Sequence, residues 1–285
     1  MIVVTGAFGF IGSNLVKELL KRDYGKILGV DFEYRPYIKN TNTQFSYTLA
    51  DEFYQNISNY EKTYGKIEAV FHEGAISSTT ETNWNNLLNK NISCSLDLIY
   101  YCRDNNISLQ YASSASVYGN PSKEQWLSKD KPTNPLNLYA KSKNFVDGAS
   151  SGILISKKPP KLLQAMRYFN VYGENEDHKG DQASPYHKFQ KQLNETGKIK
   201  LFEGSENFYR DFISVEQVID FKLKTFEEKP SGIYDVGTGN PKSFYDVAVE
   251  ICKKNSVDVN KSIEYVNMPD NIKEHYQAYS CAIIN

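Results

Sequence analysis

The sequence lacks the features of several protein classes. No apolar run approaches the ~18 residues that a membrane-spanning helix needs, and the start, Met1-Ile-Val-Val-Thr-Gly, has neither a basic segment nor a small-residue cleavage pattern. We therefore expect a protein that is neither exported nor membrane-bound. Its 33 Lys and Arg against 34 Asp and Glu give a formal net charge of -1, which argues against a nucleic-acid or membrane-surface binder that relies on bulk charge.

Cysteine is scarce. The four cysteines, Cys94, Cys102, Cys252 and Cys281, show neither C-x-x-C pairing nor the spacing of zinc ligands, so we predict no metal site and a reduced, cytoplasmic setting. Internal repeats and low-complexity tracts are also missing. What remains is a chain of 285 residues, 40% hydrophobic, which suffices for one large or two modest globular domains.

A glycine-rich turn follows the first apolar run. Ile2-Val3-Val4 leads into Gly6-Ala-Phe-Gly9-Phe-Ile-Gly12 and then into an amphipathic segment, which is the order strand, turn, helix. Glycines let backbone N–H groups approach a pyrophosphate, and the helix start favours the negative charge. Asp31 closes the next apolar run, where an acidic residue normally accepts the ribose 2′-hydroxyl of NAD. Arg35 and Lys39 are nearby cations that could receive a 2′-phosphate, so NADP remains an alternative cofactor.

Strand-like and helix-like segments then take turns. We expect strands at 45–49, 67–72, 109–112 and 162–167, and helices at 52–64, 87–103, 138–149 and near 188–195. This alternation predicts an α/β fold with a doubly wound parallel Rossmann sheet, completed by a smaller, discontinuous α/β domain. We assign residues 1–170 and 211–240 to a dinucleotide-binding domain, and residues 171–210 and 241–285 to a substrate-binding domain.

Tyr139 and Lys143 stand at i and i+4 of a predicted helix and so share one face. An ammonium beside a phenol stabilises the phenolate and moves its pKa toward neutral pH, which would make tyrosine a usable proton shuttle. The pattern is weak evidence by itself. His72 ends an apolar strand and is predicted to be a packed, hydrogen-bonded core residue, and we assign no histidine a chemical role.

Six motifs, in this order and spacing, resemble the extended short-chain dehydrogenase/reductase family. They are Thr5-Gly6-x-x-Gly9-Phe10-Ile11-Gly12, His72-x-Gly74-Ala75, Ser113-Ser114-Ala115-x-x-Tyr118-Gly119, Tyr139-x-x-x-Lys143, Arg167-x-x-Asn170-Val171-Tyr172-Gly173 and Arg210-Asp211-Phe212-Ile213-x-Val215. Within the family the chain is similar to the epimerases of ADP-activated heptoses, in Phe71 to Ala75, Ser77 to Glu81, His178-Lys179-Gly180, Leu201 to Phe208 and Tyr276-Gln277-Ala278.

The resemblance implies an isomerase. It would interconvert the D-glycero and L-glycero forms of ADP-D/L-glycero-D-manno-heptose at C6, by transient oxidation and re-reduction with bound NADP, in lipopolysaccharide core biosynthesis. By the same resemblance, Ser114 and Tyr139 hold and deprotonate the sugar hydroxyl, Lys143 binds the nicotinamide ribose and lowers the pKa of the tyrosine, and Lys179 is a second acid/base. The family also implies a homo-oligomer, with a pentamer as one option.

The resemblance implies further site residues, at the positions of this sequence that match the family's motifs. The expected cofactor contacts are Gly6, Gly9, Phe10, Ile11, Gly12, Asp31, Phe32, Glu73, Gly74, Ala75, Ile76, Ser77, Asn91, Lys143 and Val171. The expected substrate contacts are Ser114, Asn170, Phe202, Glu203, Gly204, Ser205, Arg210 and Tyr276, with Arg210 best suited to the diphosphate because its planar fork donates two hydrogen bonds.

The chain departs from the family pattern in places. Lys90 stands where asparagine is usual, Asp181 replaces a small polar residue, and Lys188 stands where histidine is frequent. The resemblance also implies a further strand and helix after Asn285, so we expect a truncated end. Two alternatives stay open, namely another nucleotide-sugar epimerase, dehydratase or reductase on the same scaffold, or a dinucleotide-binding scaffold without catalysis.

Overall fold

The computed structural model describes residues 1–35, 43–269 and 277–284, and the chain forms two compact units. The first comprises Met1–Gly119, Thr133–Tyr168 and Ile219–Tyr234, and the second Asn120–Pro132, Phe169–Val218 and Asp235–Asn285. This division differs from the sequence-based one, because residues 120–132, 169–170, 211–218 and 235–240 fall in the second unit. Asp211 illustrates the reason, since its buried carboxylate accepts N–H groups from Thr238, Gly239 and Ala282.

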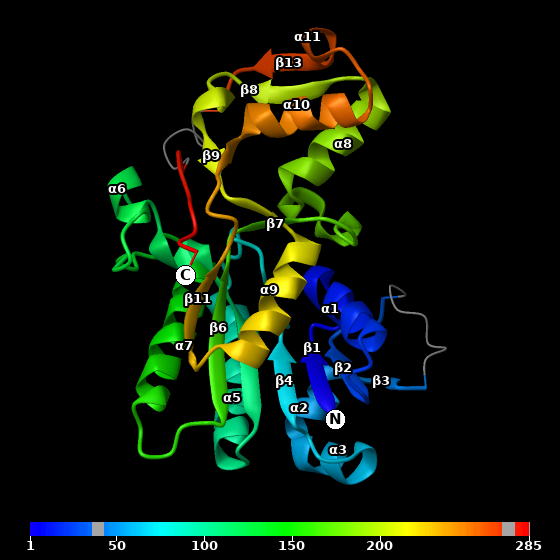
Figure 1. The fold of residues 1–285 in the computed structure, drawn as a ribbon, viewed down its shortest axis with the longest axis vertical. Coiled ribbons are helices and arrows are strands. Elements are labelled where there is room, and N and C mark those ends of the chain that lie inside the picture. Colours follow the sequence, from blue (N-terminus) through cyan, green and yellow to red (C-terminus); the bar gives the residue numbers. More distant parts are fainter. Residues whose placement is uncertain (36–42, 270–276, 285) are drawn as a thin grey trace. The chain divides into compact units, whose positions relative to one another are not determined.

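The first unit is built on a seven-stranded sheet, as the alternation predicts (Figure 1). Its strand order is β11-β6-β5-β4-β1-β2-β3, and the pairs from β3 through to β6 are all parallel. The chain runs outward from β1 in one direction and from β4 in the other, so the switch point lies between β1 and β4. The strands are β1 (Ile2–Thr5), β2 (Ile27–Asp31), β3 (Phe45–Leu49), β4 (Ala69–His72), β5 (Ser108–Ser114), β6 (Leu162–Tyr168) and β11 (Gly232–Val236).

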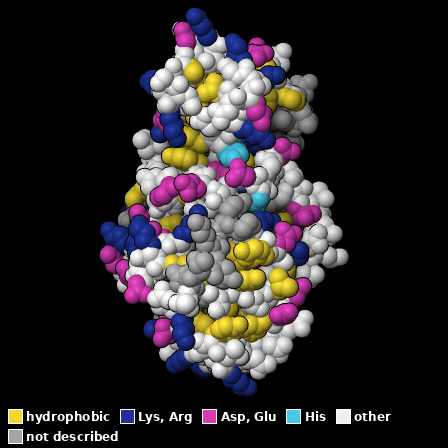
Figure 2. All heavy atoms as spheres, turned by 90° about the vertical axis from the view of Figure 1, so that its right-hand side faces the viewer, with side chains coloured by type: hydrophobic (Ala, Val, Ile, Leu, Met, Phe, Trp, Pro, Cys, Tyr) yellow, Lys and Arg dark blue, Asp and Glu magenta, His cyan; other side chains and the backbone are white. Residues whose placement is uncertain are grey.

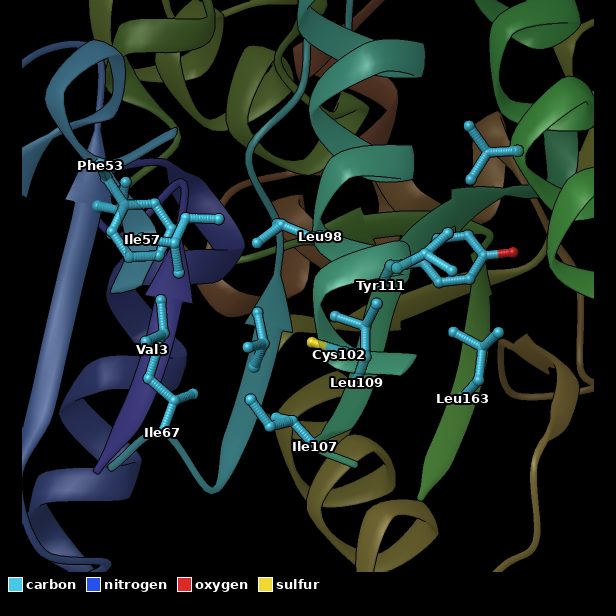
Figure 3. Close-up of a cluster of buried hydrophobic side chains, with 14 of the residues drawn as sticks. Val3, Phe53, Ile57, Ile67, Leu98, Cys102, Ile107, Leu109, Tyr111 and Leu163 are labelled. Carbon is cyan, nitrogen blue, oxygen red and sulfur yellow. The ribbon is translucent and has the colours of Figure 1, made fainter. Parts of the chain in front are cut away.

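Helices cover both faces of this sheet because its strands carry apolar side chains on both sides. Val3 packs with residues of α2 (Ala50–Gln55), α3 (Ile57–Tyr64), α5 (Cys94–Asp104) and α7 (Leu138–Leu154), whereas its neighbours Ile2 and Val4 pack with α1 (Phe10–Lys21) and α9 (Val215–Glu228). Figure 3 shows the first of these cores, in which Leu98 and Cys102 of α5 meet Leu109 of β5. The doubly wound arrangement is therefore confirmed.

Two predicted helices are interrupted. The segment predicted as one helix over 52–64 is divided at Asn56 into α2 and α3. The segment 87–103 begins as α4 (Trp84–Leu87), widens into a π-helical turn, η1 (Leu88–Ser93), and continues as α5. A π turn inside a helix often marks a functional position, and this one carries Asn91, whose side chain is used below.

The second unit contains short two-stranded sheets and its own core. In these sheets β7 (Asn170–Tyr172) pairs with β10 (Phe212–Ser214), β9 (Tyr209–Arg210) with β12 (Lys242–Ser243), and β8 (Ile199–Phe202) with β13 (Ile263–Val266). Apolar residues of α8 (Pro185–Thr196) and α10 (Phe244–Lys254) form the core with β8. The remaining elements are η2 (Ala115–Tyr118) of the first unit, and α6 (Lys123–Trp126), η3 (Asp177–Gln182), η4 (Ser205–Asn207) and α11 (Val259–Ser262).

The surface carries both charge signs. On the face in Figure 2, basic and acidic side chains are interspersed, as the near-zero net charge suggests. None of the helices in the described ranges is long and apolar enough to cross a membrane, and among the same residues no group of three or more His, Cys, Asp or Glu side chains could hold a metal ion.

Candidate active site

The glycine turn lies at the switch point of the sheet. Gly6 follows β1 with a φ of +65°, and a Cβ added to it would lie 2.7 Å from the amide nitrogen of Gly74, just after β4. Gly74 is held there because its N–H donates to the Thr5 hydroxyl at 3.1 Å. The two predicted cofactor segments therefore meet where open α/β sheets bind ligands.

The start of α1 fits a dinucleotide pyrophosphate. The first amide that bonds back into the helix is that of Ser13, which donates to Gly9 O at 3.0 Å, and the first turn has no acidic residue. The preceding amides are thus directed out of the helix start, where they favour an anion. A Cβ on Gly12 would lie 2.0 Å from Gly6 O, so the turn can pack on the helix only with glycine there. Phe10 and Ile11 belong to this same first turn.

Asp31 ends β2 beside the turn. Its carboxylate accepts the backbone N–H groups of Phe8 at 2.9 Å and Phe32 at 2.8 Å, and burial raises its pKa above the usual range despite these bonds. Arg35, one of the two cations that keep NADP open, is paired with Glu33 at 2.9 Å. The other, Lys39, lies outside the described residues.

Phe32 and Lys90 lie together near this carboxylate. The Phe32 ring is 40% exposed, and the Lys90 ammonium is 4.6 Å from its centroid, which is within the range of a cation–π interaction.

A buried hydrogen-bond chain runs from Gly74 through His72 toward Asn91. The Ser95 hydroxyl donates to Asn91 O, so its oxygen accepts from Nε2–H of His72 at 2.9 Å. This leaves Nδ1 of His72 to accept from the Thr5 hydroxyl at 2.6 Å. Burial lowers the pKa of His72 to about 3, and the imidazole is neutral, which agrees with the prediction of a packed, hydrogen-bonded core residue.

Asn91 continues the chain to α7. Its Oδ1 accepts from Ile76 N–H at 2.8 Å, while its Nδ2 donates to Ile76 O at 3.0 Å and to the Ser142 hydroxyl at 3.1 Å. Ser142 in turn donates to Tyr139 O. Both amide hydrogens of Asn91 are therefore used inside the protein. Asn91 positions the segment Gly74, Ala75, Ile76, Ser77 and the start of α7 together.

Ser114, Tyr139 and Lys143 meet at the carboxyl end of β5. Ser114 is the last residue of β5, and Tyr139 and Lys143 are buried on α7, where they are 8% and 4% exposed. The Ser114 side chain hydrogen-bonds the phenol of Tyr139. The α7 helix begins at the right place because the Asn137 side chain caps it by accepting from Ala140 N–H at 2.8 Å.

The pKa of Tyr139 differs from the expectation. Burial raises it, the hydrogen bond with Ser114 lowers it, and the charge of Asp147 raises it. Lys143 was expected to lower it, and the Lys143 ammonium donates a hydrogen bond to Ala112 O at 2.7 Å. Burial lowers the pKa of Lys143 itself to about 8, against the charges of Glu73 and Asp147, which raise it.

Asp147 is a buried carboxylate that the sequence analysis missed. It accepts hydrogen bonds from Tyr111 at 3.0 Å, Ser113 at 2.9 Å and Arg167 at 2.8 Å, and so ties α7 to β5 and β6. A signal was available, because Tyr139, Lys143 and Asp147 stand at i, i+4 and i+8 on one face of the helix.

Glu73 was predicted to contact the cofactor, but its side chain enters an ion pair. Its carboxylate lies 2.6 Å from the ammonium of Lys222 on α9, and the Tyr168 hydroxyl donates to it at 2.8 Å. Lys222 was not predicted. The sequence did hold a signal for it, because Lys222 stands on the helix face whose other residues, Val218, Ile219 and Leu223, are apolar, and a lysine there is expected to be buried.

Five predicted site residues surround the short strands of the second unit. Asn170 begins β7 and donates through Nδ2 to Asp211 O at 3.3 Å, and Val171 follows it. Phe202 ends β8, Glu203 N–H donates to Val266 O at 3.0 Å, and Gly204 has a φ of +81°.

Arg210 and Ser205 are both buried, and Arg210 lies over the Phe244 ring at 5.6 Å from its centroid. The last predicted substrate contact, Tyr276, lies outside the described residues.

Lys179 is in η3, with its ammonium 3.6 Å from Glu176. Glu176 is 1% exposed and also accepts from Gly173 and Ser184. Burial lowers the pKa of Lys179, Glu176 raises it and Lys188 lowers it.

Comparison with known proteins confirms the resemblance drawn from the motifs. An ADP-L-glycero-D-manno-heptose-6-epimerase of Brachyspira hyodysenteriae is 38% identical over 297 aligned residues, which cover 99% of this chain and 89% of that protein. The crystal structure of Helicobacter pylori ADP-L-glycero-D-manno-heptose-6-epimerase is 26% identical, with a TM-score of 0.79 over 94% of this chain and 84% of that one.

Similarity of fold extends to other nucleotide-sugar enzymes. UDP-N-acetylglucosamine 4-epimerase from Methanobrevibacter ruminantium, solved in complex with UDP-N-acetylmuramic acid, is 24% identical, with a TM-score of 0.85 over 99% of this chain and 89% of that one. The model of the NAD dependent epimerase/dehydratase family matches residues 2–237. The chain therefore belongs to the NAD dependent epimerase/dehydratase family.

Proposed function

We propose that this chain epimerises ADP-D-glycero-D-manno-heptose and ADP-L-glycero-D-manno-heptose at C6, without net redox change. The observation that carries the proposal is the buried Tyr139 phenol, hydrogen-bonded to Ser114 and one turn before Lys143, in a chain that is 38% identical to a heptose epimerase. In a bacterial cell this reaction would supply heptose for the lipopolysaccharide core. We further propose that the protein acts in the cytoplasm as a homo-oligomer.

The residues of this chain divide the proton transfers between them. A nicotinamide cofactor supplies the acceptor and donor of hydride. Ser114 would hold the C6 hydroxyl and Tyr139, in its deprotonated form, would take its proton, so that C6 becomes a ketone once hydride has left. When the ketone presents its other face and the hydride returns, Lys179 gives the oxygen a proton. Burial lowers the pKa of Lys179, which suits a lysine that must lose a proton near neutral pH.

The cofactor proposal is NADP, with NAD as the alternative. The family is NAD dependent, and the residues at the switch point fit a dinucleotide of either kind. Asp31 favours NAD because a carboxylate accepts the ribose 2′-hydroxyl, whereas Arg35 could meet a 2′-phosphate only by leaving Glu33. Mass spectrometry of the cofactor released from denatured protein decides between them, and recovery of NAD alone would remove NADP from the proposal.

The two units divide the work. We assign dinucleotide binding to the first unit and the ADP-heptose contacts of Asn170, Phe202 to Ser205 and Arg210 to the second. In this assignment the Arg210 guanidinium contacts the diphosphate, because its planar fork matches a pair of phosphate oxygens.

The test is direct conversion. The purified chain is incubated with ADP-D-glycero-D-manno-heptose without added cofactor, and the C6 configuration is followed by proton NMR. Appearance of the L-glycero form supports the proposal. No conversion after both NADP and NAD have been added contradicts it, and leaves another nucleotide sugar or a non-catalytic scaffold.

Lys179→Met separates C6 epimerisation from its alternatives. The variant should lose conversion to the L-glycero form, because the second face of C6 has no acid, while Tyr139 still supports cofactor reduction in a single turnover. A 4-epimerase on the same scaffold has no need of Lys179, so full epimerase activity in this variant would contradict its assigned role. Lys191→Met, which removes an exposed lysine of α8 paired with Glu195 at 3.9 Å, is the matched control.

A further inference from the structure

Glu176 is a buried carboxylate to which the proposed chemistry assigns no role. Its side chain is 0% exposed, and it lies directly before η3, the element that carries Lys179. One oxygen, Oε1, accepts from Gly173 N–H at 2.9 Å and from the Ser184 hydroxyl at 2.8 Å. The other, Oε2, accepts from Ser184 N–H at 2.7 Å and lies 3.6 Å from the Lys179 ammonium. Both oxygens are therefore engaged, and the ammonium is the charged member of this set of contacts.

These contacts close the loop that carries Lys179. Gly173 directly follows β7, and Ser184 caps the start of α8, where its hydroxyl oxygen accepts from His187 N–H at 3.2 Å. The Glu176 carboxylate thus bonds to both ends of the loop 173–184 at once. All of these residues belong to the second unit. The three N–H and O–H donors leave the carboxylate a single position inside the loop.

Lys179 itself is less restrained than this carboxylate. Its side chain is 20% exposed, and a lysine side chain has four rotatable bonds, whose freedom must be given up to hold the ammonium in one place. An ion pair with a group that cannot move supplies such a restraint. The neighbouring lysine of α8, Lys188, is tied elsewhere, because its ammonium donates to Asp181 O at 2.7 Å.

The restraint matters for proton transfer. An acid or base must lie within hydrogen-bond reach of the atom that it serves, and a displacement of about 1 Å can lower a rate 10²-fold. The carboxylate also stabilises the positive charge that forms when Lys179 takes up a proton. The pKa of Lys179 reflects the same surroundings, since burial lowers it, Glu176 raises it and Lys188 lowers it.

We propose that Glu176 is a positioning residue, whose fixed negative charge holds Lys179 where it exchanges a proton with the C6 oxygen. The proposal rests on the assigned role of Lys179 as the second acid/base. When the L-glycero epimer is oxidised, hydride leaves C6 for the nicotinamide and the hydroxyl proton goes to the neutral amine of Lys179. When the D-glycero epimer is oxidised, the proton goes to Tyr139. Glu176 therefore serves one face of C6 and not the other.

The experiment uses this asymmetry. The cofactor-bound protein is mixed with ADP-L-glycero-D-manno-heptose or ADP-D-glycero-D-manno-heptose, and the absorbance of reduced nicotinamide is followed in a single turnover. The key variant is Glu176→Gln, which keeps the size of the side chain and removes its charge. Reduction by the L-glycero epimer should slow by roughly 10- to 100-fold, whereas reduction by the D-glycero epimer should keep the wild-type rate.

Ser184→Ala is the matched control. It removes one hydrogen bond to Glu176 and the cap of α8, but retains the carboxylate charge beside Lys179. Its melting temperature should fall by about 2–4 °C, with wild-type rates for both epimers. A purely structural role for Glu176 predicts that Glu176→Gln changes the two rates equally, and this result would overturn the proposal. A loss confined to the L-glycero epimer in Ser184→Ala would overturn it too, because the charge would then not be the cause.

A second measurement applies if Glu176→Gln does not fold. Lys179→Met leaves the buried carboxylate without this ammonium and should melt roughly 2–4 °C below the wild type, whereas Lys179→Arg keeps the charge and should melt near it. Equal melting of Lys179→Met and the wild type overturns the proposal.

Failure of the assigned function has a different signature. If Lys179→Met reduces its cofactor equally well with both epimers, Lys179 is not the second acid/base, and the proposal for Glu176 is overturned with that assignment. If Lys179→Met is slow with the L-glycero epimer alone and Glu176→Gln is not, only the role of Glu176 is overturned.

Discussion

Replacing Tyr139 by phenylalanine tests the chemistry while leaving the packing intact. The ring is buried at the start of α7 and keeps its neighbours in the variant, because only the hydroxyl is removed. The lost hydrogen bond with Ser114 is worth about 1 kcal/mol of folding free energy. The lost proton transfer should lower kcat by roughly 10²- to 10⁴-fold, which corresponds to ~2.7–5.5 kcal/mol of activation free energy.

The assay compares three proteins by conversion of ADP-heptose, cofactor dissociation constant and urea denaturation. Tyr101→Phe is the control, because its hydroxyl donates to Glu61 at 2.8 Å between α5 and α3, and its loss should lower stability by a similar amount while leaving kcat unchanged. Tyr139→Phe should bind cofactor as the wild type does. Wild-type turnover in Tyr139→Phe would refute the assignment of the proton transfer to this phenol.

Three other perturbations follow from the geometry. Gly12→Ala places a methyl group 2.0 Å from Gly6 O and should weaken cofactor binding by about tenfold or more, ~1.4 kcal/mol, whereas Gly148→Ala, with open space at its Cβ, should leave binding unchanged and raise the melting temperature. The pKa of His72 is about 3 when folded and near 6.5 when unfolded, so the unfolded state binds more protons below pH 6.5. Stability should therefore fall by about 1.5 kcal/mol between pH 6.5 and 5 through this group, and His72→Gln should lose that part of the slope in denaturant titrations; an unchanged slope would contradict the neutral imidazole. Asp147→Asn leaves a buried arginine without its charged partner and should cost ~3–5 kcal/mol in urea denaturation, and a loss below 1 kcal/mol would contradict the assigned network.

Short-range sequence patterns were sufficient to predict the secondary-structure elements that carry the candidate site residues. The strand, the glycine turn and the helix at residues 2–21 follow from local apolar spacing and from the φ values that only glycine adopts easily. The pairing of Tyr139 with Lys143 on one face needs only the helical repeat, and the alternation of strands and helices implies the parallel sheet that was found.

Helix continuity was less predictable. The π turn that carries Asn91 keeps an apolar spacing close to that of an α-helix, so periodicity alone could not reveal it. The domain division also depended on contacts between distant segments, such as Asp211 with Gly239 and Ala282.

The amino-acid sequence by itself determined the family, the order of the elements and the identities of Ser114, Tyr139 and Lys143, because motif spacing and hydrophobic periodicity are local properties. Only the tertiary structure decided which buried charges face these residues. Glu73 meets Lys222, and Asp147 meets Arg167, across strands and helices far apart in the chain. Their effect on the pKa of Lys143 and Tyr139 depends on burial and distance, which no local pattern encodes.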